Sequence, residues 1–530
     1  MKSNLLKYLF FAFVIGLIIF SVYTIYKDNQ ENEETEQKQT DVKMQVSDDL
    51  RIGIVDFDTI NPILSKNRNV QEISRIVFDS LLGLSSNYKL EPLLATEWSK
   101  VDGNNYLLKL RDDVKFHNGK RFSARDVKYT IDTIKSNEVT SIYKENVKNI
   151  SRVEVIDETT VKLFLEQEEP FFEYNLFFPI VSEEYYQGVN FAQDAQIPIG
   201  TGRYKITVEG DYFILKQNQY DWRNKEETEY GIKNINIYKY YTMGELYNSF
   251  KIGNIDLITT NSLNIEEYVG TIGYNKKEYK GRNYDFIAIN NEHDVLQNKE
   301  VRKAVQVAID RGNIISTIYN SKYYTADFPI DYNNWISTAI VSTLEYNKEQ
   351  AEAILKDNGF EYKGGAWQKK EGDKTLKTNF TLAVNGESET RIATAENIKK
   401  QLELAGINIT IKKLSYEEYS NALTNKNYDM ILTGTRIGLS PNLNTYLGEG
   451  NFSNYNNIDV KGILNEVKNI KDENLLQEKY KVIYGLYKED MPYISLYFDR
   501  STVIYSTSLM GEVNPNHFNI FYNIEKWYRQ

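Results

Sequence analysis

The stretch FTLAVNGESETRIATAENIKKQLELAGINITIKKLSYEEYSNALTNKNYDMILT, residues 380–433, decides the fold. Large apolar residues alternate with smaller or polar ones over residues 380–384, and apolar residues then recur at helical spacing over residues 392–405. Alternation returns over residues 407–411, and a second helical segment leads into the apolar run 430–432. Strand, helix, strand, helix and strand in this order predict an α/β fold with a parallel, doubly wound sheet.

The carboxyl end of the last strand in this unit is a candidate ligand site. Ligands of open α/β sheets bind in the crevice outside the carboxyl ends of the strands. We therefore expect the segment from Thr433 to Ile437 to line a crevice.

A second informative stretch is YLLKLRDDVKFHNGKRFSARDVKYTIDTI, residues 106–134. Leucines alternate with charged residues at its start, and Asn118-Gly119 tolerates the positive φ of a tight turn. Ser123 and Asp126 have the spacing of a capping box, and apolar residues follow on one helical face. The pattern predicts a strand, a turn and a capped amphipathic helix.

Further elements are expected along the rest of the chain. Helical spacing of apolar residues predicts helices over residues 70–84, 298–319 and 347–358. Alternating or continuous apolar runs predict strands near residues 50–54, 153–165, 204–216 and 492–505.

The composition excludes several classes of function. With 530 residues and 41% hydrophobic content, the chain can form about three domains of ordinary size. A net charge of −11 argues against binding to nucleic acid and to anionic membrane surfaces. The sequence contains no cysteine, which excludes disulfides, thiolate metal sites, cysteine nucleophiles and a lipid-modified N-terminal cysteine.

The three histidines, His117, His293 and His517, are widely separated, so they give little material for a zinc site or a general base. We expect each to be structural. Carboxylates are plentiful, but no nucleophile, base and orienting group occur in a recognisable motif. The sequence therefore predicts a protein without enzyme activity and without a metal or other cofactor.

Residues 1–26 are predicted to form a transmembrane signal-anchor. The segment Tyr8–Tyr26 carries no charge, and its roughly 19 residues span about 29 Å as a helix, close to the hydrocarbon core of a bilayer. Lysines precede it and acidic residues dominate after it, so the remainder of the chain is expected outside the cell. A cleaved signal peptide is the alternative, although the apolar run exceeds the usual length of about 7 to 15 residues and no cleavage motif follows. Residues 27–46 are polar and predict a disordered linker.

Several motifs follow one another in a fixed order. They are FDTINPI (57–63), LATEW (94–98), LRDDVKFHNGKRFSARDVKYTI (110–131), PIGTGRYK (198–205), YDW (220–222), FKIGNIDL (250–257), VRKAVQVAIDR (301–311), NKEQAEAILKDNGF (347–360) and PYISLYF (492–498). This order resembles the extracellular solute-binding proteins of family 5, which include the oligopeptide-, dipeptide- and nickel-binding components of ABC transporters. The resemblance runs from about Asp49 to Phe498.

The resemblance implies a two-lobed, periplasmic-binding-protein-like α/β fold of type II with an extra subdomain. Lobe I is expected over residues 47–285, with the subdomain inserted at about 80–190, and lobe II over residues 286–495. Residues 496–530 would return to lobe I. Two chain crossings, expected near Asp285–Asn290 and Met491–Phe498, would act as hinges for closure on a ligand.

The resemblance also implies where a ligand binds. In peptide-binding members, an extended peptide lies between the lobes and pairs with two short strand-like segments. By position, these are similar to residues 65–69 and 434–437, and the second coincides with the predicted crevice. Tyr143 lies where similar proteins place an aromatic beside the ligand, although a surface or core tyrosine is the alternative. The candidate ligand-binding residues are therefore Ser65, Lys66, Asn67, Arg68, Asn69, Tyr143, Gly434, Thr435, Arg436 and Ile437.

One departure from the family concerns charge. Peptide-binding relatives place a tryptophan after the glycine and then an aspartate that pairs with the ligand's α-amino group, whereas here no acid follows Gly434 until Glu449. A buried ammonium without a carboxylate is costly, so another acid serves or the ligand has no free amine there. Arg436 suggests a carboxylate or other anion, and the alternative is that it pairs with a protein acid or projects into solvent.

The resemblance implies the substrate-binding component of an ABC importer, which captures oligopeptides by closure between lobes and delivers them to permease subunits. The alternatives are the same fold binding an oligosaccharide, a metal chelate or another anionic solute, or a ligand-sensing receptor without transport. The expected location is the cell membrane through the single N-terminal helix, with an extracellular or periplasmic, monomeric globular domain and no nucleic-acid partner.

Overall fold

The computed structural model describes residues 48–102, 104–193, 196–210, 212–224, 231–330, 333–337 and 345–530. The chain divides into a unit of Met1–Asp48 with Arg529–Gln530 and a second unit, Asp49–Tyr528, to which the following description applies. The expected anchor, residues 1–26, and the expected linker, residues 27–46, lie outside the described residues. Within the described ranges, no helix has both the length and the apolar character that crossing a bilayer requires.

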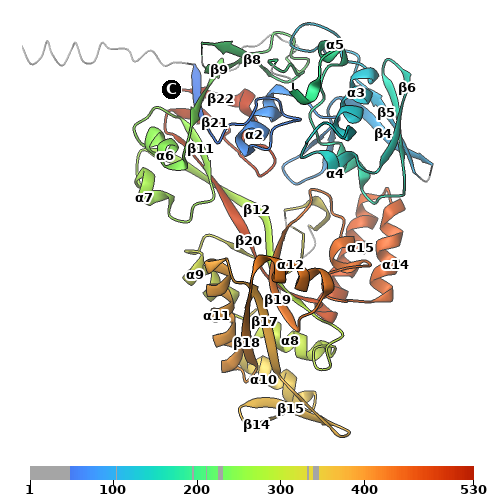
Figure 1. Ribbon diagram of the computed structural model, residues 1–530, viewed down its shortest axis with the longest axis vertical. Coiled ribbons are helices and arrows are strands. Elements are labelled where there is room, and N and C mark those ends of the chain that lie inside the picture. Colours follow the sequence, from blue (N-terminus) through green and yellow to red (C-terminus); the bar gives the residue numbers. More distant parts are fainter. Residues whose placement is uncertain are drawn as a thin grey trace, which may run out of the picture. The chain divides into compact units, whose positions relative to one another are not determined.

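One long mixed sheet organises the folded unit (Figure 1). Its order is β18 (Asn408–Leu414), β17 (Asn379–Asn385), β19 (Met430–Arg436), β12 (Tyr274–Ile289), β20 (Tyr493–Ser506), β11 (Leu257–Thr260), β1 (Asp49–Val55), β10 (Asn234–Tyr240), β9 (Tyr212–Gln217) and β8 (Tyr204–Glu209). The short strand β13 (Tyr324–Thr325) pairs with β20 outside this path.

The unit over residues 380–433 folds as its periodicity predicts. Strands β17, β18 and β19 are parallel to one another, and the connections contain α11 (Glu389–Leu404) and α12 (Tyr416–Asn425). Beyond this unit the sheet is mixed, because β12 pairs antiparallel with both β19 and β20. An antiparallel strand follows from a long chain return, which local periodicity does not record.

Strands β12 and β20 are shared by the two lobes (Figure 1). Residues 274–280 of β12 pair with residues 500–506 of β20 beside β11, and residues 284–288 pair with residues 493–498 beside β19. The register shifts between Lys280 and Tyr284 and again between Asp285 and Phe286. Regular pairing is thus interrupted where the strands pass from one lobe to the other.

The second lobe has apolar layers on both faces of its part of the sheet. Ile287 and Ile289 of β12 belong to one buried cluster, whereas Phe286 and Ala288 belong to another. Successive side chains of a strand point to opposite faces, so this division shows that helices cover both sides. The first lobe has its main core around β1, α2 (Arg68–Val77) and the inserted region.

The inserted region contains a four-stranded antiparallel sheet. Its order is β4 (Ala95–Asp102), β5 (Asn105–Leu110), β7 (Thr160–Leu165) and β6 (Ile150–Asp157). Helix α3 (Ala124–Lys135) contacts this sheet and begins with the predicted capping box, in which the Ser123 and Asp126 side chains each accept a backbone N–H. Gly119 has a φ of 84°, as the predicted turn requires.

Two helix predictions have wrong boundaries. The helix expected over residues 70–84 is α2, which ends at Val77, and the chain then enters β2 (Leu82–Leu84). The helix expected over residues 298–319 is two helices, α8 (Lys299–Val307) and α9 (Arg311–Ile318). Asp310 separates them, because its carboxylate caps α9 by accepting the Asn313 N–H at 2.9 Å.

The remaining elements are β3 (Leu90–Pro92), α4 (Lys144–Val147), α5 (Glu183–Tyr186), α6 (Met243–Lys251), α7 (Ile265–Val269), α10 (Lys348–Asp357), β14 (Glu361–Lys363), β15 (Ala366–Glu371), β16 (Lys374–Lys377), α13 (Asn444–Leu447), α14 (Ile458–Glu466), α15 (Glu473–Asp490), β21 (Leu509–Gly511) and β22 (Trp527–Arg529). Together with β2, they include three small separate sheets, β14-β15-β16, β2-β3 and β21-β22.

His117 ties the inserted region to the glycine loop before β8. Its Nδ1 accepts the Gly200 N–H at 3.2 Å, and its Nε2 lies 3.2 Å from the Gly202 carbonyl oxygen, so the neutral ring with hydrogen on Nε2 satisfies both contacts. A Cβ at Gly200 would lie 2.1 Å from the Val77 carbonyl oxygen, which explains why a glycine stands there. The prediction of a structural role for His117 agrees with these contacts.

The pH dependence of stability tests this role. Burial lowers the pKa of His117 from 6.5 to about 4. The folded chain therefore binds fewer protons than the unfolded chain between these values, and the stabilising effect is complete above pH 6.5 and is lost as the pH falls towards 4. We expect His117→Gln to make the loss of stability between pH 6.5 and 4 shallower, measured as the urea midpoint at each pH.

His293→Gln is the matched control, because the His293 ring is 26% exposed beside Asp429. An unchanged slope in His117→Gln would contradict the assignment of a buried neutral imidazole.

Candidate ligand-binding site

The first predicted ligand segment, residues 65–69, forms the turn that enters α2. Asp58 holds this turn, because its carboxylate accepts the Ser65 hydroxyl at 2.6 Å and the Lys66 N–H at 2.7 Å. Asn67 caps α2 and donates through Nδ2 to the Val55 carbonyl at 2.6 Å. The backbone of the segment is therefore fixed by its own chain.

Only part of this segment is available to a ligand. Ser65 is buried, while Lys66 and Arg68 are exposed and Asn67 and Asn69 are half-buried. The Arg68 side chain lies 3.9 Å from the Glu72 carboxylate, and half of its surface is open to solvent. The Arg68 guanidinium is thus accessible to a ligand, while its partner Glu72 is buried and depends on arginine charges nearby.

Tyr143 lies in the core of the first lobe. It is 5% exposed, and its hydroxyl donates to Gln71 Oε1. Gln71 in turn donates to the carbonyl oxygens of Pro62 at 2.9 Å and Ser65 at 2.8 Å. Tyr143 therefore supports the segment from within the lobe, and a direct contact with a ligand stays a prediction.

The second predicted segment, residues 434–437, is the end of β19 and the residue after it. Arg436 pairs with Asn283 of β12 in the register of the sheet and is exposed. Ile437 is buried and forms two hydrogen bonds with Arg282. The Ile437 N–H donates to the Arg282 carbonyl oxygen at 2.8 Å, and Arg282 Nε donates to the Ile437 carbonyl oxygen at 2.8 Å. The Thr435 hydroxyl lies 2.6 Å from the Tyr446 hydroxyl. The segment is thus locked to β12.

An ion pair beside the strand explains why a glycine stands at position 434. Arg391 Nη2 lies 2.7 Å from Asp285 Oδ1, and a Cβ on Gly434 would come within 2.4 Å of that oxygen and 2.6 Å of that nitrogen. Burial raises the pKa of Asp285 to about 6, and Arg391 opposes this shift. The close approach of the pair to the strand excludes any side chain at position 434.

One arginine of each predicted segment influences the same two carboxylates. Burial raises the pKa of Glu72 and of Asp499, and the charges of Arg68 and Arg436 lower it in both cases. Asp499 is held in place by Asn283, whose N–H and Nδ2 donate to it at 2.9 and 2.7 Å. An arginine from each predicted segment is therefore within electrostatic reach of the same two acids, beside the crossing of β12 and β20.

Several residues of this region are not singled out by the sequence. Arg75, Arg282, Asp499 and His517 come from four distant parts of the chain, and none belongs to a local motif of ligand binding. Only tertiary structure brings them together. The strand around Arg282 carries several other charged residues, so its local sequence does not mark Arg282 as a ligand contact.

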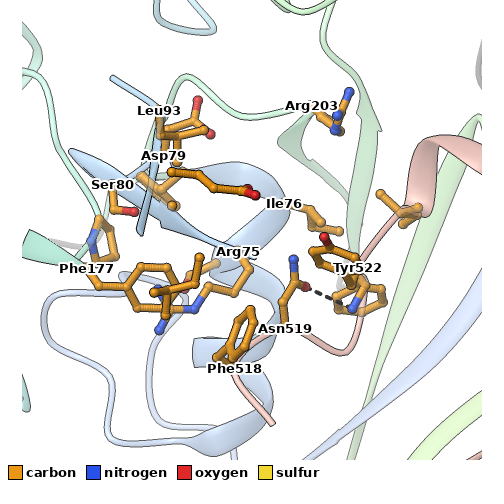
Figure 2. A pocket seen from close by; sticks show the side chains of 18 of the residues that line it. Arg75, Ile76, Asp79, Ser80, Leu93, Phe177, Arg203, Phe518, Asn519 and Tyr522 are labelled. Carbon is orange, nitrogen blue, oxygen red and sulfur yellow. Dashed lines mark hydrogen bonds between the residues drawn. The ribbon is translucent and has the colours of Figure 1, made fainter. Parts of the chain in front are cut away.

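A cavity of about 240 Å³ lies in the first lobe beside α2 (Figure 2). Figure 2 shows Arg75 next to the Phe177 ring, with Phe518, Asn519 and Tyr522 from the C-terminal segment along the same wall. The Arg75 guanidinium carbon lies 4.1 Å from the centre of the Phe177 ring. The lining also includes Arg203 and Arg223 and the acids Asp79, Glu91 and Glu525, so the cavity combines charges of both signs with aromatic surface.

No group of three or more His, Asp and Glu side chains that could hold a metal ion occurs among the described residues.

Comparison with known families gives one match that spans most of the chain. Residues 89–456 match the family described as bacterial extracellular solute-binding proteins, family 5, middle part. Among curated proteins, the chain is 23% identical to the oligopeptide-binding protein AppA of Bacillus subtilis, covering 93% of both chains. It is also 25% identical to di/tripeptide-binding protein 1 of Pseudomonas aeruginosa, covering 82% of this chain and 86% of the relative.

Solved structures show the same fold. The unliganded, open form of the periplasmic murein tripeptide binding protein MppA superposes with a TM-score of 0.78 at 18% identity, covering 91% of this chain and 97% of the other. A nickel ABC transporter protein from Bacillus halodurans gives 0.75 at 20% identity, covering 89% and 98%. The predicted two-lobed α/β fold of solute-binding proteins is thereby confirmed.

Substitution of Gly434 tests the packing of the second segment. We expect Gly434→Ala to lower the free energy of unfolding by about 1–3 kcal/mol, because the new methyl group must displace the Asp285–Arg391 pair. Gly438→Ala is the matched control, since the nearest atom to its new Cβ would be 3.7 Å away. Urea denaturation measures both, and equal stability of the two variants would contradict the assigned role of Gly434.

Proposed function

We propose a function from an established premise: the chain belongs to family 5 of the bacterial extracellular solute-binding proteins. The proposal is that its folded unit is the extracellular substrate-binding component of an ABC importer and binds peptides between its lobes. Members of the family are binding proteins, and we assign no catalytic role to this chain.

The observation that supports the proposal is that Arg68 and Arg436, one from each predicted segment, lie within electrostatic reach of Glu72 and Asp499 beside the crossing of β12 and β20. Arg68 belongs to the first lobe, whereas Arg436 ends a strand of the second. A ligand that contacts both segments binds the closed arrangement more tightly than the open one. Only such differential affinity shifts a conformational equilibrium, so this placement suits a receptor that closes on its ligand.

The hinge is proposed at the irregular part of the shared strands, which adjoins the crossings expected at Asp285–Asn290 and Met491–Phe498. Pairing between β12 and β20 is interrupted between Lys280 and Tyr284, opposite Phe498 and Arg500. A Cβ at Gly281 would lie 1.8 Å from Asp499 Oδ1, so the close approach of the strands there depends on the glycine. Bending at this interruption would leave the regular ladders on either side intact. Lobe I would comprise residues 47–285 and 496–530, and lobe II residues 286–495.

The names of the relatives support peptides as the ligands of this chain. The two curated relatives described above are named as binders of oligopeptides and of di- or tripeptides. Segments at the end of a strand and at the start of a helix offer backbone groups that bind a peptide main chain without reading its side chains. Ser65, Lys66, Asn67, Arg68, Asn69, Gly434, Thr435, Arg436 and Ile437 are the proposed contacts, and Tyr143 supports the first segment.

Membrane attachment is a further part of the proposal. The apolar segment Tyr8–Tyr26 would anchor the chain, and the polar residues 27–46 would tether the folded unit outside the cell near its permease.

Titration with peptides tests the proposed function. Addition of an equimolar mixture of random tetra- to octapeptides to the full chain should raise the thermal unfolding temperature in a saturable manner, because ligands that bind only the folded state stabilise it. A solution of free amino acids of the same composition is the control. Absence of any shift across the peptide mixture would contradict peptide binding, and a shift with oligosaccharides or metal chelates alone would replace peptides with those ligands.

A further inference from the structure

We propose that one edge of the first lobe, marked by the exposed side chains of Ile252, Ile272 and Tyr528, rests on the surface of a lipid bilayer with net-neutral headgroups. The inference rests on the membrane attachment in the proposed function and adds to it the face of the folded unit that meets the membrane. This edge lies at the amino end of β1, away from the carboxyl end that leads to the first predicted ligand segment.

The register of the sheet brings three chain segments to this edge. One row across the sheet contains, in order, Ile52 of β1, Leu257 of β11, Tyr505 of β20 and Asn275 of β12. Strands β1 and β11 are parallel, and β12 runs in their direction because β11 and β12 both pair antiparallel with β20. The segments that precede β1, β11 and β12 therefore reach the same edge, within about 14 Å of one another across the sheet.

Ile252 and Ile272 stand on two of these segments. Ile252 is the C-cap of α6 and precedes β11, and Ile272 lies between α7 and β12. After Ile252, the Asp256 N–H donates to the Arg51 carbonyl oxygen, and the Asp256 carbonyl oxygen accepts the Ser506 N–H, both at 2.8 Å. The same Ser506 pairs with the first residue of β12. Both isoleucines are thus close to the start of β1.

The exposure of these isoleucines is unusual for aliphatic side chains of this protein. Ile252 is 71% exposed and Ile272 is 87% exposed. Among the described residues, the comparably exposed aliphatic side chains are Leu404, at 69%, and Ile458, at 84%, both on the second lobe. Isoleucine is one of the residues most often buried in folded proteins. Neither Ile252 nor Ile272 belongs to the buried clusters of the first lobe or packs against them, so the core of the lobe does not account for them.

Tyr528 adds an aromatic side chain at the same edge. It is 48% exposed, and a Cβ on Gly231 would lie 2.6 Å from the Tyr528 Cβ. Gly231 comes shortly before β10, whose first residue, Asn234, is in register with Asp49. Tyrosine is enriched at membrane surfaces because its ring is apolar while its hydroxyl stays hydrated.

The expected linker joins the folded unit at this edge, which is why a lipid surface is the proposed occupant. Strand β1 begins at Asp49, and the polar residues 27–46 precede it in the sequence, after the expected anchor. A flexible chain of that length has a root-mean-square end-to-end distance of about 25 Å. This edge is therefore the part of the folded unit that an anchor would hold closest to the bilayer.

A tether makes a small apolar contact sufficient. A linker of this length gives the tethered unit an effective concentration at the bilayer on the order of millimolar, so a contact too weak to retain a free protein becomes populated. The net charge of −11 disfavours attraction to an anionic surface, so the contact depends on the apolar side chains. We therefore expect the contact to persist at high salt concentration.

Contact at this edge leaves the proposed ligand site open to solvent. The amino end of β1 would face the bilayer, whereas its carboxyl end leads to residues 65–69. A peptide could then reach the first predicted segment while the folded unit rests on the membrane. The contact would thus keep an empty receptor at the cell surface in an orientation that admits its ligand.

Fluorescence of a single label tests the inference. The chain has no cysteine, so Thr271→Cys, at an exposed position beside Ile272, accepts one environment-sensitive NBD label. The labelled full chain is reconstituted into phosphatidylcholine vesicles that contain spin-labelled lipid, and its attachment is checked by flotation with the vesicles. We expect the lipid to quench this label at least about twofold more strongly than a label at Lys400→Cys on α11 of the second lobe, at low and at high salt concentration.

Paired serine substitutions separate this edge from apolar surface in general. Ile252→Ser together with Ile272→Ser should reduce the quenching at Thr271→Cys to the level at Lys400→Cys. Ile458→Ser, which removes a similarly exposed isoleucine from the second lobe, should leave the quenching unchanged. Because all three isoleucines are exposed, thermal unfolding and peptide binding should be the same in every variant.

Each outcome has a defined meaning. Equal quenching at the two label positions in a chain that floats with the vesicles overturns the inference and leaves membrane attachment intact. Undiminished quenching in the double isoleucine variant also overturns it. Energy transfer between labelled chains without quenching by lipid assigns the edge to a second copy of this chain and overturns the lipid contact. A chain that does not float contradicts membrane attachment and this inference together, whereas peptide binding by the same chain is decided separately by the peptide titration.

Discussion

The pairing of β12 with β20 is the constraint on which the rest of the structure depends. These are the strands that the two lobes share, and the sheet continues on both sides of them. In each lobe the two strands also pair with a further strand, β12 with β19 and β20 with β11. These regular ladders keep each lobe internally rigid. The interrupted register between the ladders concentrates any flexibility at one place. The proposed ligand site lies beside that interruption, so small changes there would move whole lobes.

Charged groups dominate the region beside this crossing. Asp285 with Arg391 fixes the end of β19 and forces a glycine at position 434, whereas Asp499 with Asn283 fixes the crossing itself. These contacts satisfy the acids and hold the backbone in place.

Much of the fold could be predicted from sequence, for identifiable physical reasons. Periodicity predicted β17, α11, β18, α12 and β19 correctly, because each is an amphipathic or buried element whose pattern is local. The cap at Ser123 and the turn at Gly119 were predictable for the same reason. The antiparallel course of β12 and the break at Asp310 were not, since both depend on distant packing or on a single capping contact that interrupts an apolar pattern.

The candidate site could be predicted only in part. The positions of residues 65–69 and 434–437 follow from family resemblance, and the structure brings Arg68 and Arg436 towards the same acids. Tyr143 is buried and its hydroxyl donates to Gln71, so its expected contact with a ligand stays a prediction. Arg282 and His517 could not be found, since nothing in the neighbouring sequence records that two residues more than two hundred positions apart lie within electrostatic reach of each other.

Closure of the lobes on a peptide is the central claim, and a distance measurement tests it most directly. The chain has no cysteine, so Lys128→Cys on α3 and Lys400→Cys on α11, both at exposed positions, accept one spin label each without side reactions. Pulsed electron paramagnetic resonance then measures the distance between the labels with and without the peptide mixture. A shorter and narrower distance distribution with peptide is the predicted result, and an identical distribution at peptide concentrations that saturate binding would contradict the account.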